Sequence, residues 1–549
     1  MSFFQANYAV ATLVAVLVSI AFQAWRSRSR PAVAAIESDL STGLTEAAQR
    51  LSERLSNDFH GSVTVSNDRT SFKASMKAYW AQQECEVIPS CIVRPKDARE
   101  LSTVIRVLKN EYDQRKVAFD GDAQDEGVFA IRSGGHSAVS GAASLKGGVV
   151  VDLSHFSEVT PSEDGKSVII GTGARWGQVS RTLEKRGLAV VGGRNSDVGV
   201  GGLTLGGGLS FFSPRFGFVC NNIISYEVVL ADGSIVTASA AEYPDLWRAL
   251  KGGSNNFGIV TRFTARGFPC KGIWSGFLYM PPGQHQKVLS AFHDFLNRSE
   301  PSHNGTVFDN NAAGPMACFT YLQQINSRII SVNIVHTDPP PNNKSWPECW
   351  ANSDFAKIWR FWGDVKIRSL TDATNQMNSM NPPGRRQEFG TTTVKNNLET
   401  LVAVHDAYND AIATVRKIKG ISWTLVLQPV LPSWATKDGP NLLGLDQDPN
   451  EPLVNVQFTV NWATSDDDSL VEETTRKAIE QIDRYAAAHG TSHRYRYLNY
   501  CGRWQKPFEG YGEENLRFMR EVSRKYDPDG LFQKGCAGGF KLFGNGADA

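Results

Sequence analysis

His136 is the residue whose surroundings most directly suggest chemistry. It ends the string R-S-G-G-H at residues 132–136, inside AIRSGGHSAVSGAA (130–143). Gly134 and Gly135 let a backbone come close to a flat or anionic group. No metal-ligand spacing surrounds the histidine, so the pattern predicts a loop that lies against an organic ligand. Taken alone, the pattern also fits a structural histidine.

A glycine run forms the second candidate. Six glycines fall in the ten residues from Gly199 to Gly208, without the serines of a flexible linker. Glycine at this density lets successive backbone N–H groups point into one cavity and meet phosphate oxygens. The run therefore predicts a pyrophosphate cradle, with a packed glycine-rich turn as the alternative.

Other kinds of site are excluded by missing motifs. The chain has no G-x-x-x-x-G-K-[ST], G-x-S-x-G or H-E-x-x-H, and GTGARWG (171–177) has the wrong glycine spacing for a dinucleotide fingerprint. Its eight cysteines form no C-x-x-C or zinc spacing, so we expect no metal; disulfides are permitted, with Cys85 and Cys91 the nearest pair. The formal net charge of +1 gives no indication of a nucleic-acid partner.

Five motifs occur in a characteristic order: R-S-G-G-H, V-G-V-G-G followed by G-G-G, ALKGGSNNFGIVTRFT (249–264), YLNY (497–500) and KYDPDGLFQ (525–533). Together they resemble the berberine-bridge-enzyme-like branch of the vanillyl-alcohol-oxidase, PCMH-type FAD-binding superfamily, in its fungal form. The resemblance covers residues 85–267 and 492–540 strongly, and the segment between them only in general pattern.

The resemblance implies FAD bonded covalently through the imidazole of His136 to its 8α-methyl carbon. Many relatives add a bond from a cysteine, but Asn195 stands at that position, so a single link is expected. Val198 matches a position that gates oxygen in the family, and valine there is similar to the oxygen-permissive version. The other implied FAD contacts are Arg132, Ser133, Gly134, Gly135, Ser137, Gly199, Gly201, Gly202, Gly206, Gly207, Asn221, Gly258, Val260 and Asn499.

Catalysis in such enzymes passes a hydride to the flavin while a positioned base takes a proton from the substrate. Tyr497 and Tyr500 flank Asn499, and either tyrosine could be that base or merely pack. NVQFTVNW (455–462) predicts a strand whose polar side chains share one face, which either orients the substrate or faces solvent. They are Asn455, Gln457, Thr459 and Asn461.

The scaffold follows from hydrophobic periodicity. Leu101, Val104, Ile105 and Leu108 give a helical stripe, and Asp232-Gly233 within residues 226–239 predicts a β-hairpin. Farther on, strands at 423–431 and 452–462 lie between helices near 395–413 and 467–488.

We therefore expect an α+β fold. An FAD-binding domain at 80–267 and 492–549 is interrupted by a substrate-binding domain at 268–491, built as an antiparallel sheet backed by helices.

The N-terminus predicts a membrane helix. Residues 8–22 carry no charge and RSRSR (26–30) follows at once, which favours a signal-anchor helix at 6–25 and a spacer at 31–79 over a cleaved signal peptide. The positive-inside rule puts the body on the cytoplasmic side, whereas glycosylation sequons require the lumen. These sequons begin at Asn297, Asn304 and Asn343. We expect a membrane-anchored protein of the endomembrane system, with a secreted form as the alternative.

The resulting prediction is an FAD-dependent oxidase that moves a hydride from a small organic substrate, such as a fungal secondary metabolite, to the flavin and then to O2. A carbohydrate oxidase of the same family, a flavin-containing cyclase and a non-catalytic binding protein remain alternatives.

Overall fold

The computed structural model describes residues 46–59, 61–65, 69–118, 127–298, 308–437, 439, 441–446 and 451–544. The predicted signal-anchor helix at 6–25 lies outside these residues, as do the spacer's first residues and Asn304. None of the helices within them is long and apolar enough to cross a membrane. All eight cysteines, Cys85 and Cys91 included, are free thiols.

A small sheet near the N-terminus runs in the order β1-β2-β4-β3, with β2, β4 and β3 parallel. Its strands are β1 (Val63–Val65), β2 (Cys91–Val93), β3 (Phe129–Arg132) and β4 (Val149–Asp152). Around it lie α3 (Glu46–Asp58), α4 (Arg69–Met76), α5 (Gln82–Cys85) and α6 (Ala98–Ala118). The helical stripe is confirmed, because all four of its residues in α6 are fully buried in one core cluster with Val93 and Val149.

A second, antiparallel sheet runs in the order β5-β6-β10-β8-β9, with β7 paired to β10. Its strands are β5 (Val159–Pro161), β6 (Ser167–Gly171), β7 (Leu188–Val190), β8 (Ile223–Val229), β9 (Ile235–Ser239) and β10 (Ile259–Pro269). Its helices are α7 (Trp176–Glu184), α8 (Val200–Leu205), α9 (Ser213–Phe216) and α10 (Pro244–Ala249). The hairpin prediction is confirmed, since β8 and β9 pair antiparallel and Gly233 supplies a turn residue with φ +83°.

The third sheet has nine antiparallel strands in the order β14-β11-β13-β12-β17-β18-β16-β19, with β15 paired to β11. They are β11 (Ile273–Met280), β12 (Ala312–Leu322), β13 (Ser327–His336), β14 (Trp362–Gly363), β15 (Lys366–Arg368), β16 (Arg386–Lys395), β17 (Ser422–Val430), β18 (Leu453–Trp462) and β19 (Ser492–His493).

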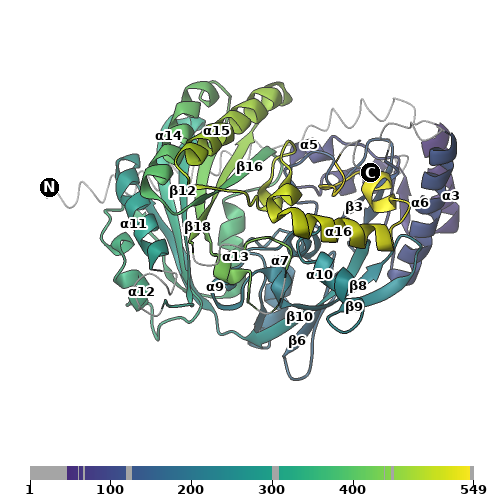
Figure 1. The fold of residues 1–549 in the computed structure, drawn as a ribbon, viewed down its shortest axis with the longest axis horizontal. Helices are drawn as coiled ribbons and strands as arrows, with labels where there is room; N and C mark the ends of the chain where they lie inside the picture. Colours follow the sequence, from purple (N-terminus) through teal and green to yellow (C-terminus); the bar gives the residue numbers. More distant parts are fainter. Residues whose placement is uncertain are drawn as a thin grey trace.

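Three helices back this sheet: α11 (His285–Asn297), α14 (Leu398–Val415) and α15 (Asp468–Ala488) (Figure 1). Two shorter helices, α12 (Glu348–Ala351) and α13 (Leu370–Ser379), complete this part. Every residue of β18 is buried, because the helices cover one face and the other face contributes to a cavity described below. The α+β prediction and the antiparallel sheet backed by helices are both confirmed.

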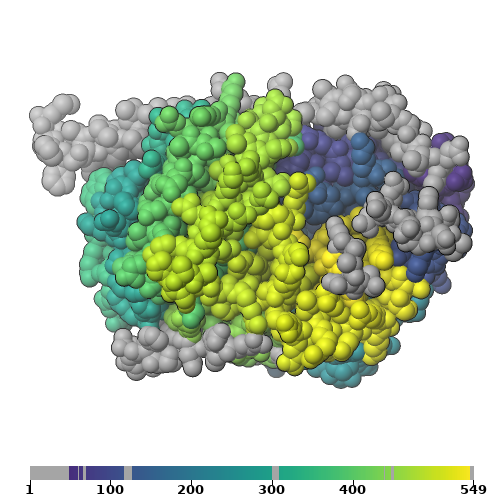
Figure 2. Space-filling view, turned by 45° about the horizontal axis from the view of Figure 1, so that its top comes forward, coloured from purple at the N-terminus to yellow at the C-terminus, as the bar shows by residue number. Residues whose placement is uncertain are grey.

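The C-terminal segment returns to the first two sheets, where α16 (Glu513–Tyr526) packs on α10. Leu531 and Phe532 enter the same core cluster as α6, and Cys536 forms a parallel bridge with Phe129. Figure 2 shows this segment, in yellow, against the blue of the first sheet's region. The domain boundaries given above remain a prediction.

Asp152, at the end of β4, anchors a buried charge network. Its Oδ2 lies 2.5 Å from Arg132 Nη2 and 2.9 Å from Arg94 Nε. Burial by itself would raise the pKa of this carboxyl, but the two guanidinium groups outweigh it and hold the pKa below the ordinary 3.8.

Replacing Asp152 with asparagine is expected to lower the free energy of unfolding by about 3–5 kcal/mol, because it leaves buried Arg132 without its counter-charge. A carboxyl with a depressed pKa stabilises the fold above its unfolded-state pKa and loses that contribution as pH falls through the folded-state value. Wild type should therefore lose stability below about pH 4, whereas Asp152→Asn should be flatter there. Urea unfolding across this pH range measures both effects. The exposed Glu163→Gln change should alter stability by no more than about 0.5 kcal/mol.

Candidate active site

One cavity of about 1140 Å³ is lined by all three parts of the fold. A pocket for one small molecule usually measures about 300–1,000 Å³, so this cavity has room for a cofactor and a substrate. It brings together most of the site residues predicted from the sequence. They are Ser133, Gly134, Gly135, His136, Ser137, Val198, Gly199, Gly201, Gly202, Gly258, Val260, Gln457, Asn461, Tyr497, Asn499 and Tyr500.

His136 lies in this lining, where its ring is held by stacking. It lies on the ring of Trp80, with centroids 4.3 Å apart and planes 11° from parallel. Desolvation, with a smaller contribution from Arg175, lowers the imidazole pKa to about 3, so the ring is neutral at physiological pH. Its buried Nε2 has no hydrogen-bond partner among the described residues, although buried polar atoms normally have one. A neutral, unpartnered nitrogen fits an imidazole that bonds to an electrophilic carbon of a bound group.

The His136 loop and the glycine run touch backbone to backbone. A Cβ added to Gly134 would lie 2.5 Å from Gly199 Cα. Arg175 Nη2 donates to the Gly134 carbonyl at 2.8 Å, and Ser133 Oγ accepts from the Gly201 N–H at 3.3 Å. The two motifs thus form one continuous wall whose closeness only glycine permits.

The glycine run is helical where the sequence predicts a cradle of free N–H groups. Residues Val200–Leu205 form α8, and the Val200 N–H donates to the Ala174 carbonyl at 2.9 Å. The Gly201 N–H is also engaged, by Ser133 Oγ. The segment therefore has the packed conformation given as the alternative, in close contact with Gly134. That it holds a pyrophosphate stays a prediction.

Gly134→Ala is expected to remove bound flavin and lower the melting temperature, because the new methyl group would overlap the backbone of Gly199. Gly283→Ala is the matched control: Gly283 is exposed and away from the cavity lining, and no atom of the described residues lies within 4 Å of its added Cβ. The ratio of flavin to protein absorbance and the melting temperature of each variant test this. Equal flavin content in both would contradict the assigned contact.

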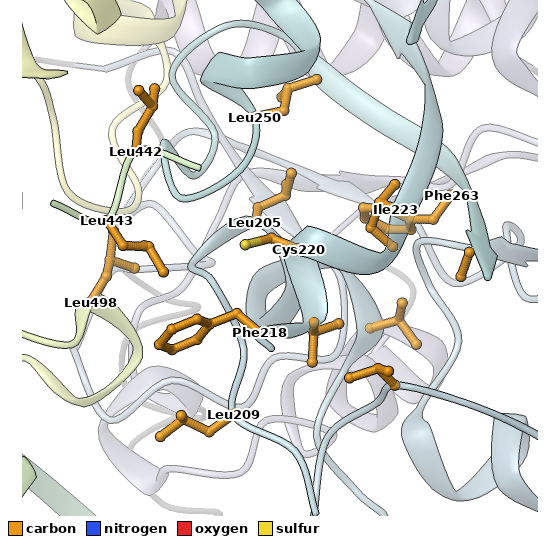
Figure 3. Packing of buried hydrophobic residues seen from close by; sticks show 14 of the residues in the cluster. Leu205, Leu209, Phe218, Cys220, Ile223, Leu250, Phe263, Leu442, Leu443 and Leu498 are labelled. Carbon is orange, nitrogen blue, oxygen red and sulfur yellow. The ribbon is translucent and has the colours of Figure 1, made fainter. Parts of the chain in front are cut away.

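Five predicted residues do not line the cavity: Arg132, Gly206, Gly207, Asn221 and Asn455. Arg132 pairs with Asp152. Asn221, implied as an FAD contact, instead donates through Nδ2 to the carbonyl oxygens of Lys437 and Gly439, at 2.6 and 3.0 Å. It therefore fixes a loop of the chain. Its neighbour Cys220 is fully buried among leucines (Figure 3).

Gly206 and Gly207 lie outside the cavity lining, next to residues that form it. A Cβ on Gly206 would lie 2.3 Å from Asn499 Oδ1, and Asn499 Nδ2 donates to the Leu203 carbonyl at 3.1 Å. Gly207 has φ +101°, which favours glycine. Asn499 therefore fastens the C-terminal segment to the end of the glycine run.

The structure assigns different surroundings to the two tyrosines. Tyr497 is fully enclosed, its oxygen accepts from the Leu209 N–H and Asn499 Nδ2, both at 3.0 Å, and burial raises its pKa. Tyr500 is half-buried, and its oxygen accepts from Arg194 Nη2 at 3.0 Å. Of the two tyrosines, Tyr500 is the one whose phenol oxygen is hydrogen-bonded to a cationic side chain.

Arg194 and Gln428 were missed in the sequence. Arg194 Nη2 also donates to Gln428 Oε1 at 2.7 Å, so the guanidinium is held between the amide and Tyr500. These residues come from separate segments, and no spacing marks them. Trp80 was missed for the same reason.

The amide face of β18 divides in two. Gln457, Thr459 and Asn461 line the cavity, and Arg385 Nε donates to Asn461 Oδ1 at 3.3 Å. Asn455 lies outside the lining because its amide is used internally, donating to Thr391 Oγ1 at 2.8 Å and accepting from Gln428 Nε2 at 3.2 Å. The solvent-facing alternative is wrong, since all four side chains are buried.

Comparisons with known proteins agree with this architecture. A sequence signature described as an FAD binding domain matches residues 89–239. The FAD-dependent monooxygenase sdcF of Emericella nidulans is 34% identical, covering 86% of this chain and 94% of that protein. The FAD-dependent monooxygenase tpcD of Cochliobolus heterostrophus is 32% identical, covering 84% and 87%.

Two solved structures share the fold. The 6-hydroxy-D-nicotine oxidase of Arthrobacter nicotinovorans has a TM-score of 0.67 at 21% identity, over 86% of this chain and 97% of that one. The xylooligosaccharide oxidase of Myceliophthora thermophila has a TM-score of 0.65 at 20% identity, over 90% and 100%.

Proposed function

The chain belongs to the fungal FAD-dependent oxidoreductases of the berberine-bridge-enzyme-like, PCMH-type superfamily, and from this membership we propose an oxidase acting on a small, largely apolar organic molecule. One observation carries the proposal. The wall that holds His136 and the wall that holds the Arg194–Tyr500 pair line the same cavity.

FAD fits the residues present, on the evidence of the unpartnered His136 nitrogen and the glycine contact beside it. His136 would hold it by a single covalent bond. Asn195, where a second bond would need a thiol, uses its Oδ1 to accept from the Asp197 N–H at 3.0 Å. When bound, FAD supplies a two-electron acceptor for a hydride and passes the electrons to O2, giving H2O2.

The chain's own residues handle the proton and the substrate. As a substrate C–H bond breaks, Tyr500 is the candidate base for the proton that leaves the adjacent O–H or N–H, and Arg194 donates to the tyrosine oxygen and fixes its position. Gln457, Thr459 and Asn461 orient the substrate's polar groups. Tyr497 keeps its proton and positions Asn499.

The lining favours an apolar or aromatic substrate over an oligosaccharide. Side chains that line the cavity from the sheet and the neighbouring helix include hydroxyl and amide groups beside apolar, aromatic and sulfur-containing ones, and the latter suit the hydrophobic part of a compact molecule. They include Phe277, Tyr279, Met316, Cys318, Val426, Met377 and Met380. A fungal secondary metabolite is a substrate of this class.

The electron acceptor is tested by following oxygen. Screening aromatic and polyketide-like alcohols for O2 uptake should find a substrate that yields one H2O2 per molecule oxidised and takes up no oxygen atom from ¹⁸O2. Two curated relatives are named monooxygenases, and incorporation of ¹⁸O with a requirement for an added reductant would favour that function instead. Turnover without O2 uptake would favour the cyclase. If no compound reduces the flavin, and a panel of oligosaccharides does not reduce it either, the non-catalytic binding protein would be favoured.

A further inference from the structure

A second cluster of reactive side chains lies at the end of β13, away from the cavity lining. His336 Nε2 is 2.7 Å from Asp309 Oδ2. With the thiol of Cys349, on α12, they form a group whose ligand atoms all lie within 4.8 Å of one another. Figure 1 places α12 near α11, at the far end of the nine-stranded sheet from the C-terminal segment.

The hydrogen bonds of His336 leave one nitrogen available as a ligand. Nδ1 contacts the Asp338 carbonyl oxygen, which can only accept, so Nδ1 carries the ring proton. Nε2 faces Asp309 Oδ2, so an imidazole nitrogen and a carboxylate oxygen stand together where a cation could bind both.

The surrounding contacts orient the carboxylate and the strand end. Asp309 Oδ1 accepts from the Asn311 N–H at 2.9 Å, which leaves Oδ2 facing His336. Thr337 Oγ1 donates to Asn311 Oδ1 at 3.1 Å, and Trp350 Nε1 donates to the Val335 carbonyl at 2.9 Å. Backbone and carbonyl partners of this kind accompany metal ligands in proteins.

We propose that Asp309, His336 and Cys349 bind a divalent transition metal of the zinc type, with water as the fourth ligand. One sulfur, one imidazole nitrogen and one carboxylate oxygen suit Zn²⁺ and are a poor match for Mg²⁺ or Ca²⁺. The Asp309 side chain is 37% exposed, which gives a metal ion and its water an open side. The present 2.7 Å separation is that of a hydrogen bond, so entry of the metal moves the two ligands apart by about 0.5 Å.

A thiol nucleophile is a poorer explanation of the same cluster. A nucleophilic cysteine needs an imidazole nitrogen within hydrogen-bond reach to take its proton. Nδ1 of His336 contacts the Asp338 carbonyl and Nε2 contacts Asp309 Oδ2, so the hydrogen-bond partner of each nitrogen is an oxygen and not the Cys349 sulfur.

Such a site would be structural, because it joins the segment before β12, the end of β13 and α12. The sequence gives no sign of it, since Asp309 and His336 stand 27 residues apart in no zinc spacing.

Zn²⁺ titration of the untagged, flavin-containing protein by calorimetry, after dialysis against a chelator, tests the proposal. We expect one Zn²⁺ per chain, with affinity at least about tenfold weaker in both Cys349→Ser and His336→Gln. Cys270→Ser, at another half-buried free cysteine, should bind as wild type does. Titration with Co²⁺ should give the visible absorption of a tetrahedral thiolate complex, lost in Cys349→Ser.

Unchanged flavin content shows that each variant has folded. The proposal is overturned if wild type binds no Zn²⁺, or if the correctly folded Cys349 and His336 variants bind it as tightly as wild type. Neither result bears on the proposed oxidase, which uses other residues.

Discussion

Replacing His136 with alanine is expected to abolish the covalent attachment of flavin. The imidazole is buried, neutral because its pKa lies at about 3, and its Nε2 has no partner within the described chain. Alanine offers no nucleophile, and Asn195 supplies no second point of attachment. On a denaturing gel under ultraviolet light, the wild-type band should fluoresce and the His136→Ala band should be dark.

His155→Ala is the matched control, because His155 is an exposed histidine in the same part of the chain. Its band should fluoresce as brightly as wild type. Fluorescence of the His136→Ala band would place the bond on another residue, and a dark wild-type band would show that flavin is held without a covalent bond.

Removing the positive charge at Arg194 is expected to slow flavin reduction by about 100-fold, within the range that a positioned base contributes. Methionine keeps much of the side chain's length but cannot donate to the Tyr500 oxygen. Tyr500→Phe, which removes the proton acceptor, should slow the reaction at least as much. Anaerobic stopped-flow measurement of flavin bleaching, with the substrate from the oxygen-uptake screen, gives both rates.

A conservative replacement separates chemistry from simple packing. Arg194→Lys keeps a positively charged donor, so it should partly restore the rate that Arg194→Met loses. Tyr497→Phe removes an oxygen that accepts two hydrogen bonds, so it should reduce flavin retention more than it changes the rate of flavin reduction. A rate in Tyr500→Phe within about threefold of wild type would exclude this tyrosine as the base.

The sequence predicts well the parts of this site that are continuous in the chain, and poorly the parts that come together from distant segments. The His136 loop and the glycine run were found because each is a short continuous string whose glycines have a clear physical meaning. The same argument left the conformation of the run open, because the contact between Gly134 and Gly199 is made in three dimensions.

The partner of the proposed base was harder to predict. The sequence named Tyr497 and Tyr500 as candidates, but Arg194 stands 306 residues from Tyr500 and is not unusual in its own segment. Asn221 shows the opposite error: the resemblance implied an FAD contact, yet its amide is saturated by carbonyl oxygens of a loop more than two hundred positions away. The alternation of side chains along a strand placed Asn455 on one face with Gln457 and Asn461. It could not show that the Asn455 amide is already hydrogen-bonded to other residues of the chain.

The return of residues 531–536 to the first core bears on how the protein is made. Phe532 packs beside α6, and Cys536 bridges to Phe129, so this core is completed by residues synthesised long after α6. Until residues 531–536 pack, the core exposes apolar surface, which is the kind of surface that makes a partly folded chain prone to aggregate. A variant cut near residue 530 is therefore expected to be degraded in cells rather than to persist as an inactive folded protein.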